Sequence, residues 1–208
     1  TTYAKIEYSL IPDFNLQSPL KMLVFNELKN SDEICFVCRK ESFKTDIESF
    51  ISELIISDLI LVEKRLDAIE KDQKKKFSDL RKKEYDLMLK CKKKLDDNKS
   101  IKGIETTLEE NKMLLTYQFL SLKPLIAVIN IPEGQKPDKE ISRIIEEQYD
   151  VPNVILSVEL EEEISRLPKM DREEFMKEMG IDESALNKMT QLALFGLGLI
   201  SFFTVGED

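Results

Sequence analysis

The sequence predicts an α/β fold in which a mainly parallel, helix-covered sheet is interrupted by a long helical insertion. Short apolar runs typical of buried strands alternate with amphipathic segments over residues 1–45 and 121–195. Between them, residues 46–120 carry apolar side chains at helical spacing and then a charge-rich stretch. With 208 residues and 42% hydrophobic content, the chain is large enough to bury a substantial core.

The first part of the chain predicts two strands and a helix. Residues 3–11 (YAKIEYSLI) alternate apolar and polar side chains, which favours a strand. A loop marked by Pro12 and Pro19 leads into a short helix over residues 20–28. Residues 33–37 (EICFV) are apolar on both sides, as in a strand of a covered sheet.

Residues 46–120 predict a helical hairpin that projects from the sheet domain. Asp46 is the expected N-cap of its first helix. The apolar residues of that helix recur at positions Ile47, Phe50, Ile51, Leu54, Ile55, Leu59, Val62, Leu66 and Ile69. We expect the root residues Leu54, Leu59 and Leu66 to pack against the sheet domain.

The apolar pattern then narrows to a single seam, which requires a partner helix. The seam consists of Phe77, Leu80, Glu84, Leu87 and Cys91, spaced alternately by three and four residues. Residues 107–120 (TLEENKMLLTYQFL), which follow Asn98 and Gly103, are the expected second arm of the hairpin.

The second half of the chain predicts further strands and helices. The strongest strand signal is residues 124–131 (PLIAVINI), a continuous β-branched run that ends at Asn130 and Pro132. The remaining expected elements are a helix at 138–149, a strand at 153–158, helices at 161–167, 171–179 and 183–195, and a strand at 199–204.

Charge is distributed unevenly along the chain, whose net charge is −9. Residues 71–94 contain 11 Lys or Arg against 4 Asp or Glu, whereas residues 133–208 contain 8 against 18. The basic stretch favours either an anionic partner such as RNA or an ordinary solvated helix surface, and the sequence leaves both open. The lysines that would contact RNA are Lys74, Lys75, Lys76, Lys82, Lys83, Lys92, Lys93 and Lys94.

Three cysteines and no histidine limit the possible metal and redox chemistry. Cys35 and Cys38 have C-x-x-C spacing but lie in an apolar run without a second ligand pair, so we expect no metal site. An odd cysteine count without a signal peptide favours a reducing, cytoplasmic location. We expect no membrane segment, because the longest apolar run is too short to span a bilayer. The chain begins with Thr1 rather than Met, so we expect an N-terminal portion to be absent.

Polar residues follow two of the expected strands. Asn130 and Glu133 lie three residues apart after the strand at 124–131, and Ser157 follows the strand at 153–158. Ligands of open parallel sheets bind at the carboxyl ends of strands, so an amide and a carboxylate there could bind the edge of a purine. The alternative is simple turn chemistry.

Several motifs resemble the YchF family of Obg-like ATPases, which are relatives of the P-loop GTPases. The segment LSLKPLIAVINIPEG resembles the family's L-T-x-K-P-(apolar strand)-N-x-x-E motif, and DIESFISELIISDLILVEKRL resembles its D-I-E-x-I-x-x-E-L-x-L-A-D-L-x-x-x-E-K-R-L helix. DREEFMKEMGIDESALNKM and LGLISFFTVGE resemble the run into the family's C-terminal TGS domain. The resemblance covers almost the whole chain.

The resemblance implies the organisation of the chain and the roles of its residues. Residues 1–45 and 121–195 would form a GTPase-like domain without its N-terminal P-loop part, 46–120 a coiled-coil hairpin insertion, and 196–208 the start of a TGS-like region. Asn130 and Glu133 match the base-binding motif, and Ser157 falls near its supporting loop. The family's association with translation implies a ribosome, RNA or protein partner.

Two departures from the family pattern affect the phosphate end of the site. The G-x-x-x-x-G-K-[ST] loop is absent, and no glycine precedes Gly103. The D-x-x-G motif falls at Leu10-Ile11-Pro12-Asp13, where leucine cannot bind a magnesium shell and Asp13 would repel a phosphate.

These observations favour a degenerate YchF-like binding or scaffold module that lacks nucleotide hydrolysis. Such a module needs no cofactor and would bind ATP or GTP weakly at most. The alternative is an ATP- or GTP-binding P-loop enzyme of the family whose phosphate loop lies upstream of Thr1. An RNA- or ribosome-contacting arm is compatible with either.

Overall fold

The computed structural model describes residues 7–11, 21–71, 78–181 and 183–199. The chain forms two compact units, which we describe separately. The sheet unit comprises Thr1–Ser9, Asp32–Ile47 and Pro124–Asp208, and the helical unit comprises Leu10–Ser31 and Glu48–Lys123. No helix of the described residues combines the length and apolar character that a bilayer span requires.

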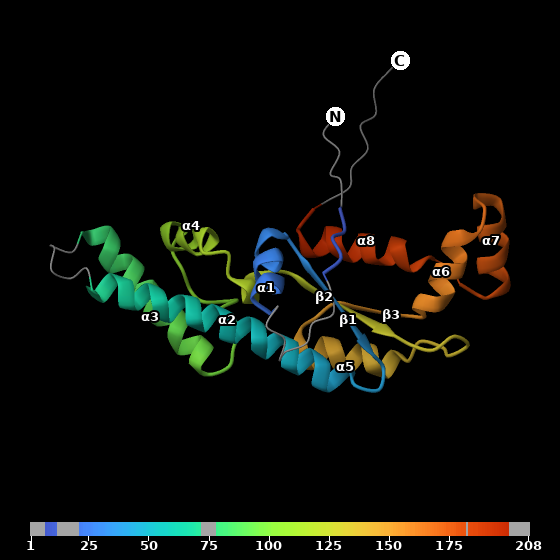
Figure 1. The fold of residues 1–208 in the computed structure, drawn as a ribbon, viewed down its shortest axis with the longest axis horizontal. Coiled ribbons are helices and arrows are strands. Elements are labelled where there is room, and N and C mark those ends of the chain that lie inside the picture. The colour runs from blue at the N-terminus through green and yellow to red at the C-terminus, as the bar shows by residue number, and fades with distance from the viewer. Residues whose placement is uncertain (1–6, 12–20, 72–77, 182, 200–208) are drawn as a thin grey trace, which may run out of the picture. The chain divides into compact units, whose positions relative to one another are not determined.

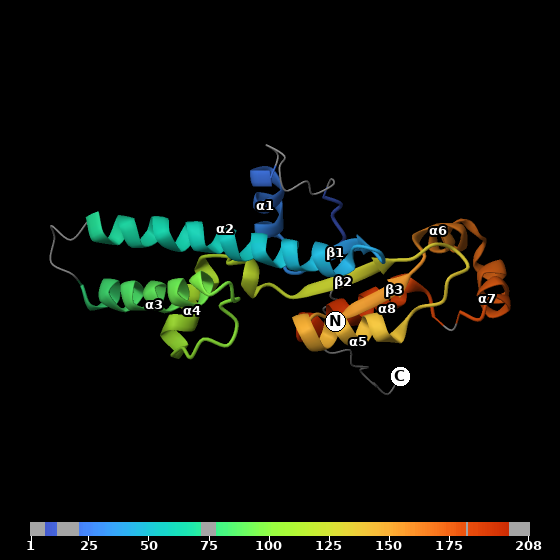
Figure 2. The same ribbon diagram turned by 90° about the horizontal axis from the view of Figure 1, so that it is seen from below.

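In the described residues, the sheet unit contains three parallel strands in the order β1-β2-β3 (Figures 1 and 2). These strands are β1 (Ile34–Arg39), β2 (Leu125–Asn130) and β3 (Asn153–Leu156). The predicted α/β fold with a parallel sheet is therefore confirmed. The expected strand at residues 3–11 falls partly outside the described residues, and its described part, 7–11, forms no strand. Residues 200–204 of the expected last strand also lie outside them.

Helices cover both faces of the central strand β2. Its consecutive residues Ile126, Ala127, Val128 and Ile129 are all buried, as expected when both sides of a strand are covered. In Figure 1 helix α8 (Ala185–Gly196) lies above the sheet and α5 (Lys139–Tyr149) lies below it. Helices α6 (Val158–Arg166) and α7 (Lys169–Glu178) complete the unit.

Local capping chemistry fixes where these helices begin. The Asp138 side chain accepts a hydrogen bond from the Glu140 N–H at the start of α5. Ser157 and Ser184 cap α6 and α8 in the same way. The expected N-cap at Asp46 is wrong, because α2 (Phe43–Lys71) begins three residues earlier and places Asp46 in its first turn. There the Ser42 hydroxyl donates to the Asp46 carboxylate at 2.6 Å.

The helical unit contains α1 (Lys21–Asn30), most of α2, α3 (Asp79–Asp96), α4 (Leu108–Thr116) and the 3₁₀ turn η2 (Leu120–Leu122). Helix α3 runs antiparallel to α2, as both views of the ribbon show. Side-chain contacts agree with this antiparallel arrangement. Glu63 of α2 binds Lys92 of α3, and Glu70, which comes later in α2, binds Tyr85, which comes earlier in α3.

The expected arms of the hairpin are therefore only partly right. The first helix ends at Lys71, and α3 is a separate helix that lies along α2. The segment at 107–120 forms the short α4 and the η2 turn, and α4 contacts α3, the helix that carries the predicted seam. Because α3 runs back along α2, it covers the apolar side of that helix. The buried cluster so formed contains Ile55, Val62, Leu66, Leu87, Met88, Cys91, Leu95, Ile101, Leu114 and Phe119.

The three expected root residues differ in their surroundings within the helical unit, and their packing on the sheet domain stays a prediction. Leu66 belongs to the core of the helical unit, and Leu59 packs against that core. Leu54 is buried but is not part of the cluster. Of the predicted seam, Leu87 and Cys91 are buried, Leu80 is 57% exposed, and Phe77 lies outside the described residues.

Candidate functional site at the carboxyl edge of the sheet

The carboxyl ends of all three strands meet at Asn130. In the strand register, Asn130 lies opposite Arg39 of β1 and Leu156 of β3. Its backbone carbonyl accepts a hydrogen bond from the Lys40 N–H at 3.2 Å. Its side-chain Oδ1 accepts one from the Val158 N–H at 3.0 Å. Asn130 therefore connects the segments that follow β1 and β3, which are the two neighbours of β2.

Ser157 lies directly beside this connection. Its side chain is buried, and its hydroxyl accepts a hydrogen bond from the Leu160 N–H at 3.4 Å as the N-cap of α6. Because the hydroxyl is already used for capping, Ser157 can support the site by positioning the Val158 N–H. The structure thus brings the segments of Asn130 and Ser157 together.

Glu133 lies on the turn that follows β2 and is exposed. Gly134, the next residue, has φ +76°, a left-handed conformation that glycine adopts without steric cost. Gln135 accepts a hydrogen bond from the Lys40 Nζ at 3.3 Å, so Lys40 holds both ends of the turn. Sequence reasoning missed Lys40, since nothing in its local pattern marks a residue just after a strand as a partner of Gln135, 95 residues away in the chain.

Comparison with known proteins shows which proteins this chain resembles in sequence and in fold. The chain is 30% identical over 187 residues to the ribosome-binding ATPase YchF of Bacillus subtilis, covering 86% of this chain and 50% of that protein. It is 33% identical over 174 residues to the Obg-like ATPase 1 of Saccharomyces cerevisiae, covering 78% of this chain and 44% of that protein. A solved structure of the Schizosaccharomyces pombe YchF GTPase shares the fold with a TM-score of 0.74 at 23% identity, covering 89% of this chain and 55% of that one. No family model matches the chain.

The chain is a homologue of the YchF/Obg-like ATPases. It spans about half the length of the curated relatives it matches.

Two of the segments that resemble YchF motifs contact each other in the helical unit. Asp58, from the helix motif, is 1% exposed and accepts hydrogen bonds from the backbone N–H groups of Leu120 and Ser121, both at 2.8 Å. Burial raises the pKa of this carboxyl above its ordinary value, and the hydrogen bonds from Ser121 and Leu120 oppose that rise. Lys123 of the same segment donates to the Lys29 carbonyl at 3.0 Å.

Residues 10–13, where the sequence resemblance places the YchF D-x-x-G motif, are only partly described. Leu10 is 96% exposed. Asp13 lies outside the described residues.

The two cysteines of the C-x-x-C pair lie on β1, where Cys35 is exposed and Cys38 is buried. Burial raises the pKa of the Cys38 thiol to about 12, and partial desolvation together with the nearby Glu33 charge raises that of the Cys35 thiol to about 11. Among the residues that can be described, no group of three or more potential metal ligands lies together.

The lysines proposed for RNA binding differ in their surroundings. Lys74, Lys75 and Lys76 lie outside the described residues. Lys83 binds Glu109 at 2.6 Å, Lys92 binds Glu63 at 2.6 Å, and Lys94 donates to the Lys102 carbonyl. In the described part of the chain, Lys82 and Lys93 are exposed and make no ion pair.

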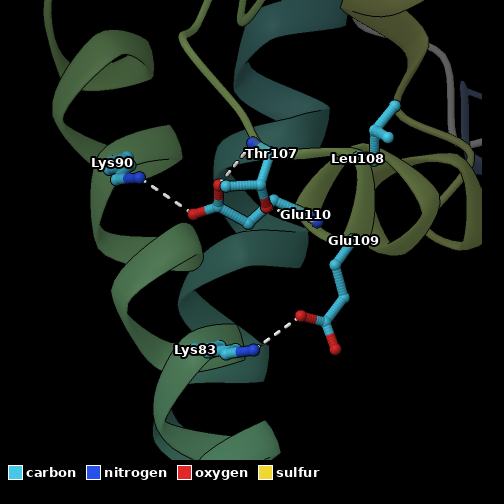
Figure 3. Close-up of a pocket in the computed structure, with 6 residues that line it drawn as sticks. All are labelled: Lys83, Lys90, Thr107, Leu108, Glu109 and Glu110. Atoms are coloured by element: carbon cyan, nitrogen blue, oxygen red, sulfur yellow. Dashed lines mark hydrogen bonds and ion pairs between the residues drawn. The ribbon is translucent and has the colours of Figure 1, made fainter.

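A hollow of about 510 Å³ lies between α3 and the N-terminus of α4 (Figure 3). Lys83 binds Glu109 across it and Lys90 binds Glu110 at 2.9 Å. Glu110 also accepts a hydrogen bond from the Thr107 N–H, which together with Lys90 lowers the pKa of its carboxyl to about 2. Since these charges pair with one another, the hollow is a contact between helices rather than an open ligand site.

Proposed function

We propose that this chain is a ribosome-associated binding module that holds a nucleobase at the carboxyl edge of its sheet and does not hydrolyse nucleotides. The observation that carries the proposal is the bond from the Val158 N–H to Asn130 Oδ1. It fixes the orientation of the Asn130 side chain, so that the Nδ2 amide, which has no partner among the described residues, remains available as a donor.

Glu133 supplies the complementary acceptor in this proposal. A purine presents a ring nitrogen that accepts a hydrogen bond and nitrogen groups that donate. An amide donor from Asn130 and a carboxylate acceptor from Glu133 match that pattern. Lys40 would contribute by holding the turn that carries Glu133, since its Nζ binds Gln135.

The absence of hydrolysis is inferred from the phosphate end of the site. Phosphoryl transfer depends on positioning and on stabilisation of charge, chiefly by magnesium held by oxygen ligands. Leu10 offers a hydrocarbon side chain at the position of the family's metal-shell aspartate. A module with base contacts alone would bind ATP or GTP weakly and without magnesium dependence.

Association with ribosomes is proposed from the relatives, several of which are named ribosome-binding ATPases. In this proposal residues 46–120, with α2 and α3 as the two arms, correspond to the family's coiled-coil hairpin, and residues 196–208 begin a TGS-like region. Lys82 and Lys93 are the described lysines best placed to contact an RNA backbone, because neither is neutralised by a neighbouring carboxylate. A ribosome-bound role would place the protein in the cytoplasm.

The second candidate is an ATP- or GTP-hydrolysing enzyme whose phosphate loop lies upstream of Thr1. It is favoured by the names of the relatives, which are ATPases, and by the share of their length that this chain spans. Under this alternative the same carboxyl edge would bind the base.

Calorimetry and phosphate-release measurements separate the two candidates. ATP and GTP are titrated with and without magnesium into the chain, into the longest native form of the protein and into its Glu133→Ala variant. The binding module predicts weak, magnesium-independent binding that the substitution abolishes, with no phosphate release above background. Robust turnover that disappears in Glu133→Ala would establish the enzyme instead.

A further inference from the structure

Strand β3 has one edge that no described residue pairs with. On its inner side, the Pro152 and Leu156 carbonyls accept hydrogen bonds from the Ala127 and Ile131 N–H groups of the β2 segment, both at 2.9 Å. Backbone groups of alternate residues face opposite sides of a strand, so those of Asn153 and Ile155 face away from β2. Unpaired N–H and C=O groups of this kind are a template for another strand.

A hollow of about 360 Å³ opens along the same edge. The strand contributes Asn153, Val154 and Ile155 to its lining, while α5 and the segment before it contribute one wall and α8 the other. In Figure 1 these helices lie on opposite sides of the sheet, so the edge of β3 lies between them. Ile155 and Leu192 supply an apolar surface, and Ser142 binds the Asn153 side chain at 2.8 Å.

The charge lining this hollow is positive. Lys139 on α5 and Lys188 on α8 are exposed and make no ion pair with any described residue. Asp138 is the acidic residue of the lining, and its carboxylate already caps α5 by accepting the Glu140 N–H at 2.9 Å. The rest of the C-terminal half is acidic, so the two lysines give this groove a local charge opposite to that of its surroundings.

We propose that the open edge of β3 binds an extended, acidic peptide segment of a partner protein as an additional strand. Backbone hydrogen bonds to Asn153 and Ile155 would hold the segment, as in other cases of strand addition to a sheet edge. Side chains of neighbouring residues in a strand point to opposite faces. A segment with two adjacent acidic residues therefore directs one carboxylate toward Lys139 and the other toward Lys188.

The proposed contacts lie along the outer edge of β3, whereas Asn130 lies on β2, on the opposite side of that strand. These contacts do not depend on nucleotide binding. Occupation of the open strand edge by a second copy of this chain is the contrary outcome, and it would appear as self-association.

The test uses the isotope-labelled chain and the peptide acetyl-TVEEVT-amide, with acetyl-TVKKVT-amide as the opposite-charge control. Amide NMR spectra follow each titration, with attention to Asn153, Val154 and Ile155. The titrations are repeated with Lys139→Glu/Lys188→Glu and with the matched control Lys169→Glu/Lys177→Glu, which places the same charge change on α7.

We expect the acidic peptide to shift the β3 amides and slow their hydrogen exchange. We expect the Lys139→Glu/Lys188→Glu protein to bind it at least about tenfold more weakly. The α7 variant should bind as the unaltered chain does, and the basic peptide should bind the Lys139→Glu/Lys188→Glu protein better than the unaltered one. Equal responses to both peptides would overturn the proposal, as would β3 shifts that depend on protein concentration alone and so indicate self-association.

Discussion

The buried carboxylate of Asp58 binds the backbone N–H of Ser121 at 2.8 Å, across 63 residues of sequence. Its second oxygen accepts the Leu120 N–H at the same distance. The two bonds satisfy donor groups at the start of the η2 turn, which directly precedes β2 in the chain. Asp58 therefore holds the η2 turn against α2 within the helical unit.

Replacing Asp58 by Ala should destabilise the helical unit strongly. Both N–H groups would remain buried without an acceptor, at a cost of about 1–3 kcal/mol for each group. Asp58→Asn, which keeps one acceptor, should fall between the Ala variant and the unaltered chain. Urea unfolding followed by circular dichroism measures the loss. The control is Asp67→Ala, an exposed acidic residue on the same helix, and equal effects at both positions would contradict the assigned role.

Two leucines of α3 should differ sharply in their contribution to stability. Leu87 is fully buried in the helical core, whereas Leu80 is 57% exposed. Leu87→Ala should lower the free energy of unfolding by about 2–5 kcal/mol, because it leaves a cavity. Leu80→Ala should change it by less than about 0.5 kcal/mol. Denaturant titrations of both variants provide the test, and a large effect at Leu80 would place α3 differently against α2.

Glu33 should make the stability of the chain depend on pH near neutrality. Burial raises the pKa of its carboxyl from 4.5 to about 7, and its Oε1 is buried without a hydrogen-bond partner. The raised value means that the folded state favours the protonated form. The resulting stabilisation is fully present below about 4.5 and is lost as pH rises through about 7.

The variant Glu33→Gln isolates this effect. We expect the denaturation midpoint of the unaltered chain to fall between pH 5 and pH 8 by more than that of Glu33→Gln. Gly196 lies against the same carboxylate, and a Cβ atom there would collide with it. A Gly196→Ala variant should accordingly be destabilised, and less so when combined with Glu33→Ala, which removes the atoms that the new Cβ would meet. Parallel pH profiles for the unaltered chain and Glu33→Gln would refute the assignment.

Two substitutions at Asn130 should separate structural support from base binding. Asn130→Ala removes the acceptor of the Val158 N–H and should cost about 1 kcal/mol of stability. Asn130→Asp keeps an acceptor and should therefore stay close to the unaltered stability, yet it lacks the amide donor. We expect nucleotide binding to be lost in both. Thermal unfolding and calorimetry on the same samples measure the two properties, and retained binding by Asn130→Asp would exclude the amide as a donor.

The exposed lysines of α3 should determine the salt dependence of any RNA binding. Each lysine–phosphate contact adds about 0.7–0.9 to the slope of log affinity against log salt. Lys82→Gln/Lys93→Gln should therefore reduce the slope for ribosomal RNA by up to about 1.4–1.8. The matched control is Lys83→Gln/Lys92→Gln, whose lysines already bind Glu109 and Glu63. An unchanged slope in the first variant would favour the alternative of an ordinary solvated helix surface.

Most strands and helices of this protein could be predicted from the sequence, because their signals are local. The β-branched run that became β2 and the capped, amphipathic segment that became α5 carry their own periodicity and end signals. The alternation of strands and helices along the sequence also predicted that the strands of the sheet are parallel. The expected strand at 3–11 shows the limit of such patterns: alternation indicates a strand only where a surface covers its apolar side, and Leu10 is 96% exposed.

Only the tertiary structure decided which distant segments meet. The stretch between Lys71 and Asp79 contains neither Gly nor Pro, so no turn signal marked the point where α3 folds back along α2. The bond from Val158 to Asn130 spans 28 residues and the bond from Ser121 to Asp58 spans 63. Such pairings depend on strand register and on which apolar faces cover each other, and these are properties of the packed chain that no local pattern of residues contains.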